Sequence, residues 1–227
     1  PVFFSMNTRL KVALSPPVAA NLRSIAMQLY YSPNACSLAI HILLREAGLP
    51  AKLVRVDLAS HRTEHGQDFY TLNPMGQVPL LQLDDGRTLG EGAVIARYLA
   101  QLAPDAGLMP APDSEAYWKV AQWQHFVATE LHKGFTPLFN PQLSAEAKAV
   151  LRPGLAAKFA LLDKVLAAQR WLGGEQFSVA DAYLFTVTRW AGFVGLALDG
   201  LAGVQRFMQD AATRPAVQAA LAAEGAA

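Results

Sequence analysis

The sequence has few charged residues and almost no cysteine. Only 16% of its 227 residues are charged, and 19 Lys and Arg against 18 Asp and Glu leave a formal net charge of +1. Since 52% of the residues are hydrophobic, the composition excludes a disordered chain. The near-balance of charge gives no electrostatic reason to expect nucleic acid as a partner. One cysteine excludes an internal disulfide and a cysteine-rich zinc site, so we expect no metal and a reducing, cytoplasmic setting.

Long uninterrupted apolar runs are also missing. The most apolar stretch, residues 182–198, is interrupted by threonines and an arginine and is short for a bilayer span, so it predicts a buried helix and no membrane partner. Residues 1–26 lack a regular pattern and contain a Pro-Pro pair. We expect an N-terminal tail there, either disordered or an artefact of the assigned start, with the working protein starting at Met27.

Two kinds of periodicity divide the remaining residues. Residues 27–106 alternate strand and helix patterns in the order β-α-β-(α)-β-β-α, which is typical of a small α/β domain. Proline and glycine interrupt residues 104–112, and apolar residues then recur at helical spacing, so we predict an all-helical domain over residues 113–227. The expected strands are 27–31, 52–56, 78–83 and 87–89, and the expected helices are 38–47, 93–102, 117–127, 145–168, 182–190, 204–210 and 215–223.

Cys36 is the first candidate for chemistry. It follows a predicted strand and a Ser-Pro-Asn turn, at the point where a helix begins. Free backbone N–H groups and the helix dipole favour the thiolate there, and the thiolate is the reactive form. The neighbouring Ser37 could donate a hydrogen bond to the sulfur anion. A free cysteine is also common as a small buried residue, so its position alone leaves both interpretations open.

Two further segments suit a ligand that resembles a peptide. Val78-Pro79 is a natural place for a cis peptide bond, and the Val78 backbone could pair with an extended peptide. An ordinary turn into an edge strand would have the same sequence. Glu91 and Gly92 begin the next helix, where free N–H groups bind a carboxylate and the Glu91 side chain can take an ammonium group. Alternatively, Glu91 only complements the helix dipole.

Some residues are expected to serve folding. Ser178 and Asp181 have capping-box spacing ahead of an apolar run, so Asp181 is predicted to fix a helix start. His41 and His65 are expected to be structural or to face solvent. Among the tryptophans, we expect core or interface positions for Trp118, Trp123 and Trp190, and partial exposure for Trp171.

Taken together, these segments resemble a known family. The resemblance runs from Met27 to the C-terminus, in matching order and spacing, through Tyr30–Ser37, Asn73–Leu80, Gly90–Gly92, Ala128–Pro137 and Phe177–Phe185. On these segments the chain is similar to the bacterial beta-class glutathione S-transferases. The resemblance implies a thioredoxin-like N-terminal domain, an all-α C-terminal domain and a homodimer. It also implies glutathione as co-substrate, beside a pocket for a hydrophobic electrophile.

The resemblance also assigns roles to residues. The implied catalytic set is Cys36, Ser37, Tyr31, His132 and Lys133. The implied glutathione-binding set is Cys36, His61, Val78, Pro79, Glu91, Gly92, His125, Thr129, Glu130 and His132. The sequence departs from the family where His61 stands for a frequent lysine, His125 for a frequent asparagine, and glycines for a Ser or Thr beside Glu91. The glycines keep the backbone donors but remove a hydroxyl.

We expect a detoxifying enzyme that joins the glutathione thiolate to electrophilic substrates. Cys36 leaves a second interpretation open, in which a mixed disulfide with glutathione supports thiol-transferase or peroxidase activity. A third interpretation is a non-catalytic binding module, because a fold does not determine function. A dithiol oxidoreductase is excluded, since it needs a second cysteine.

Overall fold

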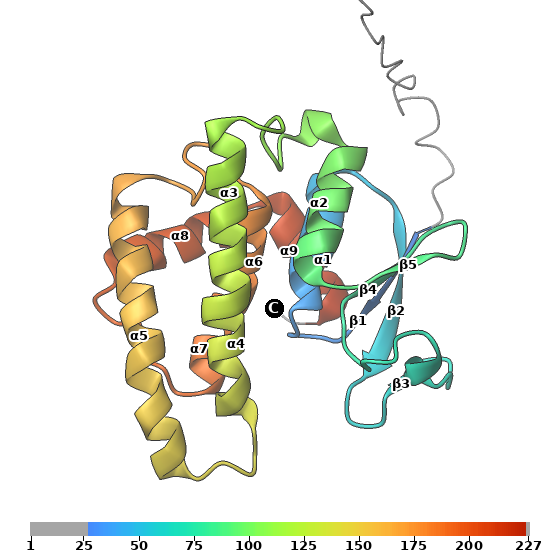
Figure 1. Ribbon diagram of the computed structural model, residues 1–227, viewed down its shortest axis with the longest axis horizontal. Helices are drawn as coiled ribbons and strands as arrows, with labels where there is room; N and C mark the ends of the chain where they lie inside the picture. Colours follow the sequence, from blue (N-terminus) through green and yellow to red (C-terminus); the bar gives the residue numbers. More distant parts are fainter. Residues whose placement is uncertain (1–26, 226–227) are drawn as a thin grey trace, which may run out of the picture.

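The computed structural model describes residues 27–225. A mixed sheet with two covering helices forms one half of the molecule, and helices form the other (Figure 1). The tail predicted over residues 1–26 lies outside the described residues. The sheet half and the helical half confirm the fold class expected from the sequence.

The sheet has five strands in the order β3-β2-β1-β4-β5. Its strands are β1 (Met27–Tyr31), β2 (Ala51–Asp57), β3 (Arg62–Thr63), β4 (Leu80–Gln82) and β5 (Thr88–Leu89). β1 and β2 are parallel and are joined through helix α1 (Ser37–Glu46), whereas β4 pairs with its neighbours antiparallel. The expected strand over 78–83 is shorter in the structure, and pairing begins only after Pro79, which has no N–H to donate.

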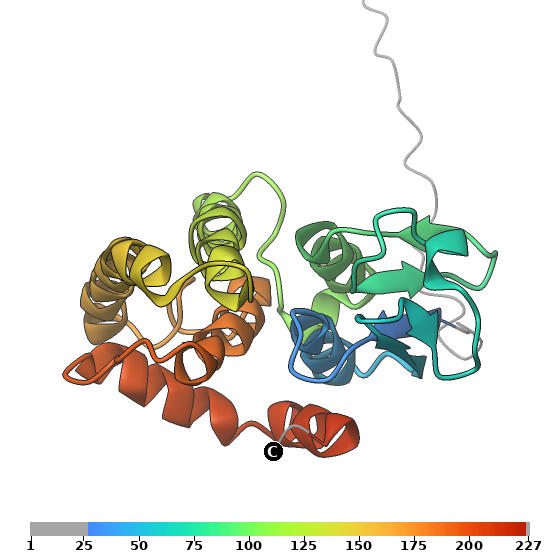
Figure 2. The same cartoon turned by 90° about the horizontal axis from the view of Figure 1, so that it is seen from below.

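Two layers cover the sheet. α1 and α2 (Gly92–Leu102) lie on the face toward the helical half (Figure 2). On the opposite face, Phe69 of the short helix η1 (Phe69–Thr71) packs in a small cluster with Tyr30 and Val56. The alternating burial along β2 agrees with the half-buried strand predicted there.

The other half is built from helices. They are η2 (Pro104–Ala106), α3 (Glu115–Phe126), the π-helix η3 (Val127–His132), α4 (Lys133–Phe135), η4 (Thr136–Phe139), α5 (Ala145–Ala168), α6 (Val179–Thr188), α7 (Trp190–Phe193), α8 (Ala202–Ala212) and α9 (Pro215–Glu224). The predicted bounds of the longest helix are confirmed, and Pro153 lies inside it. Within the described part of the chain, no helix is long and apolar enough to cross a membrane.

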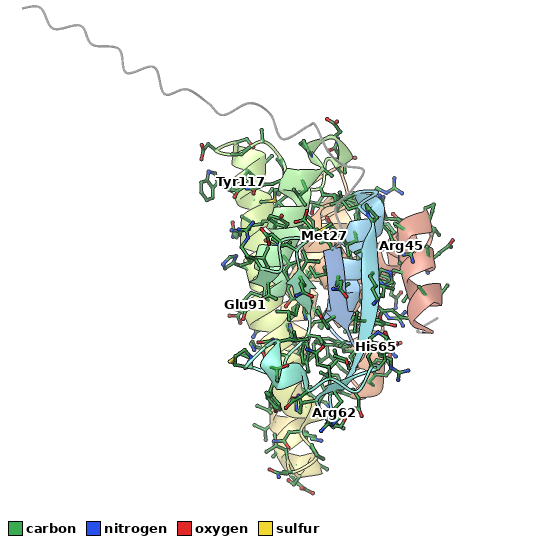
Figure 3. The ribbon with its side chains drawn as sticks, turned by 90° about the vertical axis from the view of Figure 1, so that its right-hand side faces the viewer. Met27, Arg45, Arg62, His65, Glu91 and Tyr117 are labelled. Atoms are coloured by element: carbon green, nitrogen blue, oxygen red, sulfur yellow. The ribbon has the colours of Figure 1, made fainter. Side chains whose placement is uncertain are left out.

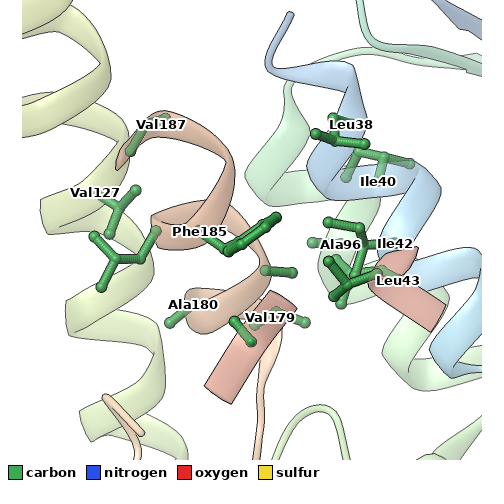
Figure 4. Close-up of a cluster of buried hydrophobic side chains, with 14 of the residues drawn as sticks. Leu38, Ile40, Ile42, Leu43, Ala96, Val127, Val179, Ala180, Phe185 and Val187 are labelled. Carbon is green, nitrogen blue, oxygen red and sulfur yellow. The ribbon is translucent and has the colours of Figure 1, made fainter. Parts of the chain in front are cut away.

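A continuous hydrophobic core joins the two halves. Leu38 and Leu43 on α1 lie opposite Val179 and Phe185 on α6, and all four are buried (Figure 4). Burying such side chains contributes about 1.5–3 kcal/mol each. The buried helix predicted from residues 182–198 is shorter in the structure, since α6 ends at Thr188. α6 holds the sheet half and the helical half together.

The C-terminal helix returns to the sheet half and packs against α1 (Figure 2). There His41 Nδ1 lies 2.9 Å from a carboxylate oxygen of Glu224, and both side chains are buried. The Nε atom of Arg45, labelled in Figure 3, donates to the other ring nitrogen of His41 at 3.0 Å. The expectation of a structural role for His41 agrees with this contact.

The capping box at α6 is confirmed, because Asp181 accepts from the Ser178 backbone and hydroxyl and from the Leu172 N–H. Burial raises the pKa of Asp181 to about 6 against these hydrogen bonds.

Two tryptophan expectations were wrong in part. Trp171 is 2% exposed, since Phe177 and Phe207 pack edge-on against it. Trp118 is 59% exposed and therefore lies outside the core of the chain, while an interface position stays a prediction.

Candidate active site

Two adjoining cavities lie where the sheet half meets the helical half. The first has a volume of about 250 Å³ and the second about 580 Å³. Cys36, Val78, His132 and Lys133 line both of them. These residues come from the start of α1, the segment before β4 and the junction of η3 with α4. The geometry therefore places one thiol, one imidazole and one ammonium group between two ligand-sized spaces.

Cys36 is the N-cap residue of α1 and is partly buried. Its Sγ–H donates to the Val78 carbonyl oxygen at 3.2 Å. Burial raises the pKa of the Cys36 thiol to about 11, although backbone N–H groups at the helix start and Lys133 act in the lowering direction. The helix N–H groups act in the direction expected from the sequence, but the loss of solvation outweighs them, so the neutral thiol is favoured.

Ser37 and Tyr31 do not face these cavities. The Ser37 hydroxyl is buried and bonds back to the Ser32 backbone, accepting from its N–H and donating to its C=O. It is thus committed to the turn and is not directed at a sulfur anion as predicted. The Tyr31 ring is 9% exposed, belongs to the main core and contacts His41. Neither side chain lines the two cavities, and the catalytic roles expected for both stay predictions.

The Val78-Pro79 peptide bond is cis, as predicted. The Val78 N–H donates to no acceptor within residues 27–225, and its carbonyl oxygen accepts only the Cys36 thiol. Both residues line the first cavity. An extended backbone lying in that cavity would find an unused donor at Val78 and an acceptor whose present partner is a weak S–H group.

Glu91, the N-cap residue of α2, has an unusual backbone conformation. Its φ of 59° and ψ of 108° place a non-glycine residue at positive φ, which costs about 1–3 kcal/mol and is found most often at functional sites. Glu91 and Gly92 line the first cavity together with Thr129. Glu91 is labelled in Figure 3, and His132 of η3 and Lys133 of α4 line the same cavity. The start of α2 thus offers a carboxylate and helix N–H groups to the same space.

His132 has two aromatic neighbours. Its Nδ1 lies 2.5 Å from the Tyr183 hydroxyl oxygen, and the Trp190 ring meets it edge to face at 4.9 Å between centroids. Burial, with a contribution from Lys133, lowers the pKa of His132 to about 4. The imidazole is therefore neutral at physiological pH, and Lys133 supplies the positive charge at the junction of the cavities.

The remaining predicted residues fall into two groups. Thr129 lines the first cavity and His61 the second, where His61 Nδ1 contacts the Gly76 carbonyl oxygen at 3.1 Å. The other two predicted residues, His125 and Glu130, line neither cavity.

Both have polar neighbours elsewhere. A nitrogen of Arg97 lies 3.4 Å from His125 Nδ1, and Lys158 forms an ion pair with Glu130 at 2.6 Å.

His61 and His65 are four residues apart, a spacing that would form a metal-binding pair on a helix. Here they flank the short strand β3, and His65 is exposed beside Glu64. Over residues 27–225, no group of three or more His, Cys, Asp or Glu side chains is arranged to hold a metal ion.

Tyr183 was not assigned a role from the sequence, yet it lines the first cavity beside His132. Tyr183 lies in one of the segments that carry the family resemblance, but a tyrosine in a largely apolar helix is usually interpreted as a core residue. The signal available was its polar hydroxyl in a largely apolar helix, since a phenol that is shielded from water needs a hydrogen-bond partner.

A thioredoxin-like sheet, a helical half and a thiol at a cavity between them define the glutathione transferase fold. Residues 35–102 match the family model described as glutathione S-transferase, N-terminal domain, and residues 126–215 match its C-terminal domain. The chain is 50% identical over 199 residues to glutathione S-transferase GstA of Escherichia coli O157:H7, covering 88% of this chain and 99% of the relative.

Solved structures give the same result. A sphingomonad glutathione S-transferase complexed with glutathione is 44% identical with a TM-score of 0.84, covering 88% of this chain and 100% of that one. A beta-class glutathione S-transferase of Sphingomonas chungbukensis is 42% identical with a TM-score of 0.85 and the same two coverages. The chain belongs to the glutathione S-transferase family, and the resemblance to its bacterial beta class is confirmed.

Proposed function

We propose that this protein is a glutathione transferase that joins the sulfur of glutathione to an electrophilic carbon. The observation that carries the proposal is the pair of cavities that meet at Cys36, His132 and Lys133. One cavity would hold the tripeptide and the other the electrophile, so the sulfur and the carbon it attacks would meet at their junction. The relative solved with glutathione and the names of the curated relatives support this function.

The first cavity suits the tripeptide along its length. The Val78 backbone would pair with the cysteinyl part, and the Glu91 carboxylate would take the ammonium of the γ-glutamyl end. The free N–H groups at the start of α2 would bind the carboxylate of the same end. These partners would place the thiol of glutathione beside Cys36, because Cys36 and Val78 are in contact.

The reaction requires the glutathione thiol to lose its proton, which would pass to solvent water. The resulting anion would lie near the Lys133 ammonium, the His132 imidazole and the N–H groups that begin α1. The sulfur then forms a bond to the electrophilic carbon, and the leaving group departs with the electron pair of the bond that breaks. Holding both reactants in adjoining cavities makes this step effectively intramolecular.

The second cavity suits a hydrophobic electrophile. The aromatic residues Phe139, Trp190 and Phe193 line it together with Leu58 and Pro33. Phe139 and Phe193 are 45% and 59% exposed, so a bound apolar molecule would remove aromatic surface from water.

The mixed-disulfide reaction has less support. It needs Cys36 as a thiolate, and burial holds the pKa of Cys36 near 11. The relatives named above carry the transferase name. We therefore assign the nucleophile to glutathione and a hydrogen-bonding role to Cys36.

The test is conjugation of glutathione with 1-chloro-2,4-dinitrobenzene by the wild-type protein and by Cys36→Ala. We expect turnover by both, with kcat/KM of the variant reduced about tenfold or less, because one neutral hydrogen-bond donor is lost. No turnover by the folded wild type would refute the proposed function. Turnover by the wild type alone would instead make Cys36 the nucleophile.

We also propose that the protein is a cytoplasmic homodimer, and that each chain has domains over residues 27–106 and 113–227.

The dimer is supported by exposed apolar side chains. Val94 on α2 and Trp118 on α3 are 51% and 59% exposed, and Arg97 Nε donates to Gln124 Oε1 between the same two helices. Large exposed apolar side chains on neighbouring helices favour association. Light scattering should give twice the mass of one chain, and Trp118→Glu should shift it toward one. A wild-type monomer would contradict the dimer.

A further inference from the structure

Tyr183 and His132 form the closest polar pair at the junction of the two cavities. The Tyr183 hydroxyl oxygen lies 2.5 Å from His132 Nδ1, and their rings meet edge to face at 5.8 Å between centroids. Tyr183 comes from α6 in the core and His132 from the end of η3, so the contact joins two rigid elements. Trp190 also contacts His132, which further restricts the imidazole.

The protons of this pair can be assigned. Burial raises the pKa of Tyr183 and lowers that of His132 to about 4, so both groups are neutral near pH 7. Within the described residues, the Tyr183 hydroxyl has no hydrogen-bond partner besides His132. A phenol that did not donate to His132 would find no other acceptor among the described residues, since the partly buried Tyr183 side chain packs against the hydrophobic core. The phenol therefore donates to Nδ1, and the imidazole carries its own proton on Nε2.

We propose that Tyr183 is a positioning residue, which holds His132 as the Nε2–H tautomer so that this N–H donates to the sulfur of bound glutathione. Nε2 has no hydrogen-bond partner among the residues that the structure describes, and His132 lines both cavities beside Cys36. The inference rests on the proposed conjugation function. It gives Tyr183 a role in the reaction, and this role is exerted through His132.

The arrangement has a physical advantage at this site. A neutral N–H donor stabilises a sulfur anion without adding a second positive charge next to Lys133. An imidazole without the Tyr183 contact can rotate, and it can exchange its proton between the two ring nitrogens. In the Nδ1–H form it would present a lone pair to the sulfur anion and would repel it.

The experiment compares Tyr183→Phe with the wild type over a pH series of conjugation rates. The variant loses one hydroxyl and keeps the ring. We expect kcat to fall about fivefold and the apparent pKa of the bound glutathione thiol to rise by about half a unit, since one hydrogen bond to the anion is weakened. KM for glutathione should change less than about twofold, because Tyr183 does not hold the peptide part.

A double-mutant cycle with His132→Ala tests whether Tyr183 acts through His132. In the His132→Ala background, Tyr183→Phe should change kcat less than about twofold. An equal loss in both backgrounds would overturn the inference, because Tyr183 would then act on the sulfur or on packing by itself. Unchanged kcat and pH profile in the single variant would overturn it as well.

A spectroscopic measurement is independent of turnover and of the folding of the variants. Long-range proton–nitrogen NMR correlations of ¹⁵N-histidine-labelled wild type should show His132 with its proton on Nε2 at pH 7. A proton on Nδ1 would overturn the inference. If the wild type fails to conjugate glutathione, the proposed function falls, and the NMR result still reports the tautomer separately.

Discussion

Replacing Gly92 by serine is predicted to tighten glutathione binding. Gly92 is the first residue of α2 and lines the first cavity beside Glu91. A Cβ at this position would meet only Pro79 Cγ, at an ordinary contact distance of 3.7 Å. The backbone there is not in the left-handed region, so a side chain introduces no strain.

The expected gain in glutathione affinity follows from one added hydrogen bond. A hydroxyl on Cβ of residue 92 could donate to the γ-glutamyl carboxylate that the start of α2 is proposed to bind. A hydrogen bond to a charged acceptor is worth about 1.5–3 kcal/mol net, and exposure to solvent at the neighbouring Glu91 reduces the expected gain to about 1 kcal/mol. About 1 kcal/mol corresponds to a Kd for glutathione about fivefold lower than that of the wild type.

Titration calorimetry with glutathione measures this change, and Gly92→Ala is the matched control. Serine and alanine both fill the space beside Pro79 and both remove the flexibility of glycine from the unfolded chain. Only serine brings the hydroxyl. If the two variants bound glutathione equally well, or if serine bound it less tightly than glycine, the proposed position of the γ-glutamyl end would be wrong.

Three further predictions concern polar groups that are buried or partly buried. Asp181→Ala removes the acceptor of hydrogen bonds of 2.6–2.9 Å and should cost about 3 kcal/mol of stability, seen as a melting point lower by about 6–12 °C; an unchanged melting point would contradict it. Because the pKa of Cys36 is raised to about 11, alkylation by iodoacetamide should be slow at pH 7 and accelerate about tenfold per pH unit up to that value. A plateau below pH 9 would show a lower pKa. Glu224→Ala leaves His41 Nδ1 unpaired in the core and should cost about 1–3 kcal/mol, more than Glu224→Gln, which keeps an acceptor.

The fold was predictable because its signals are local. Helix α5 runs from Ala145 to Ala168 as its periodicity predicts, and the capping box at Asp181 needs only residues close in sequence. The order of strand and helix patterns in the first half likewise depends on short segments. The family resemblance added the arrangement of these segments in space, which periodicity does not contain.

The chemistry of the site depended on distant contacts. The protonation state of Cys36 depends on burial among segments that include Val78, 42 residues away in sequence. This burial raises the pKa of the thiol more than the N–H groups at the helix start lower it. Ser37 turns back to Ser32 because the tight turn offers backbone partners within reach. The partner of Tyr183 lies 51 residues away, so no local pattern could reveal its role.

The neutral state of the Cys36 thiol is consistent with the proposed reaction. A Cys36 thiolate would repel the glutathione anion at the junction of the cavities. Two neighbouring negative charges disfavour the ionisation of both thiols. A neutral thiol can instead turn its S–H from the Val78 carbonyl to the arriving sulfur. Lys133 and the neutral His132 then act on one anion only, that of the substrate. It follows that a substitution lowering the pKa of Cys36 should slow conjugation while it accelerates disulfide exchange with glutathione.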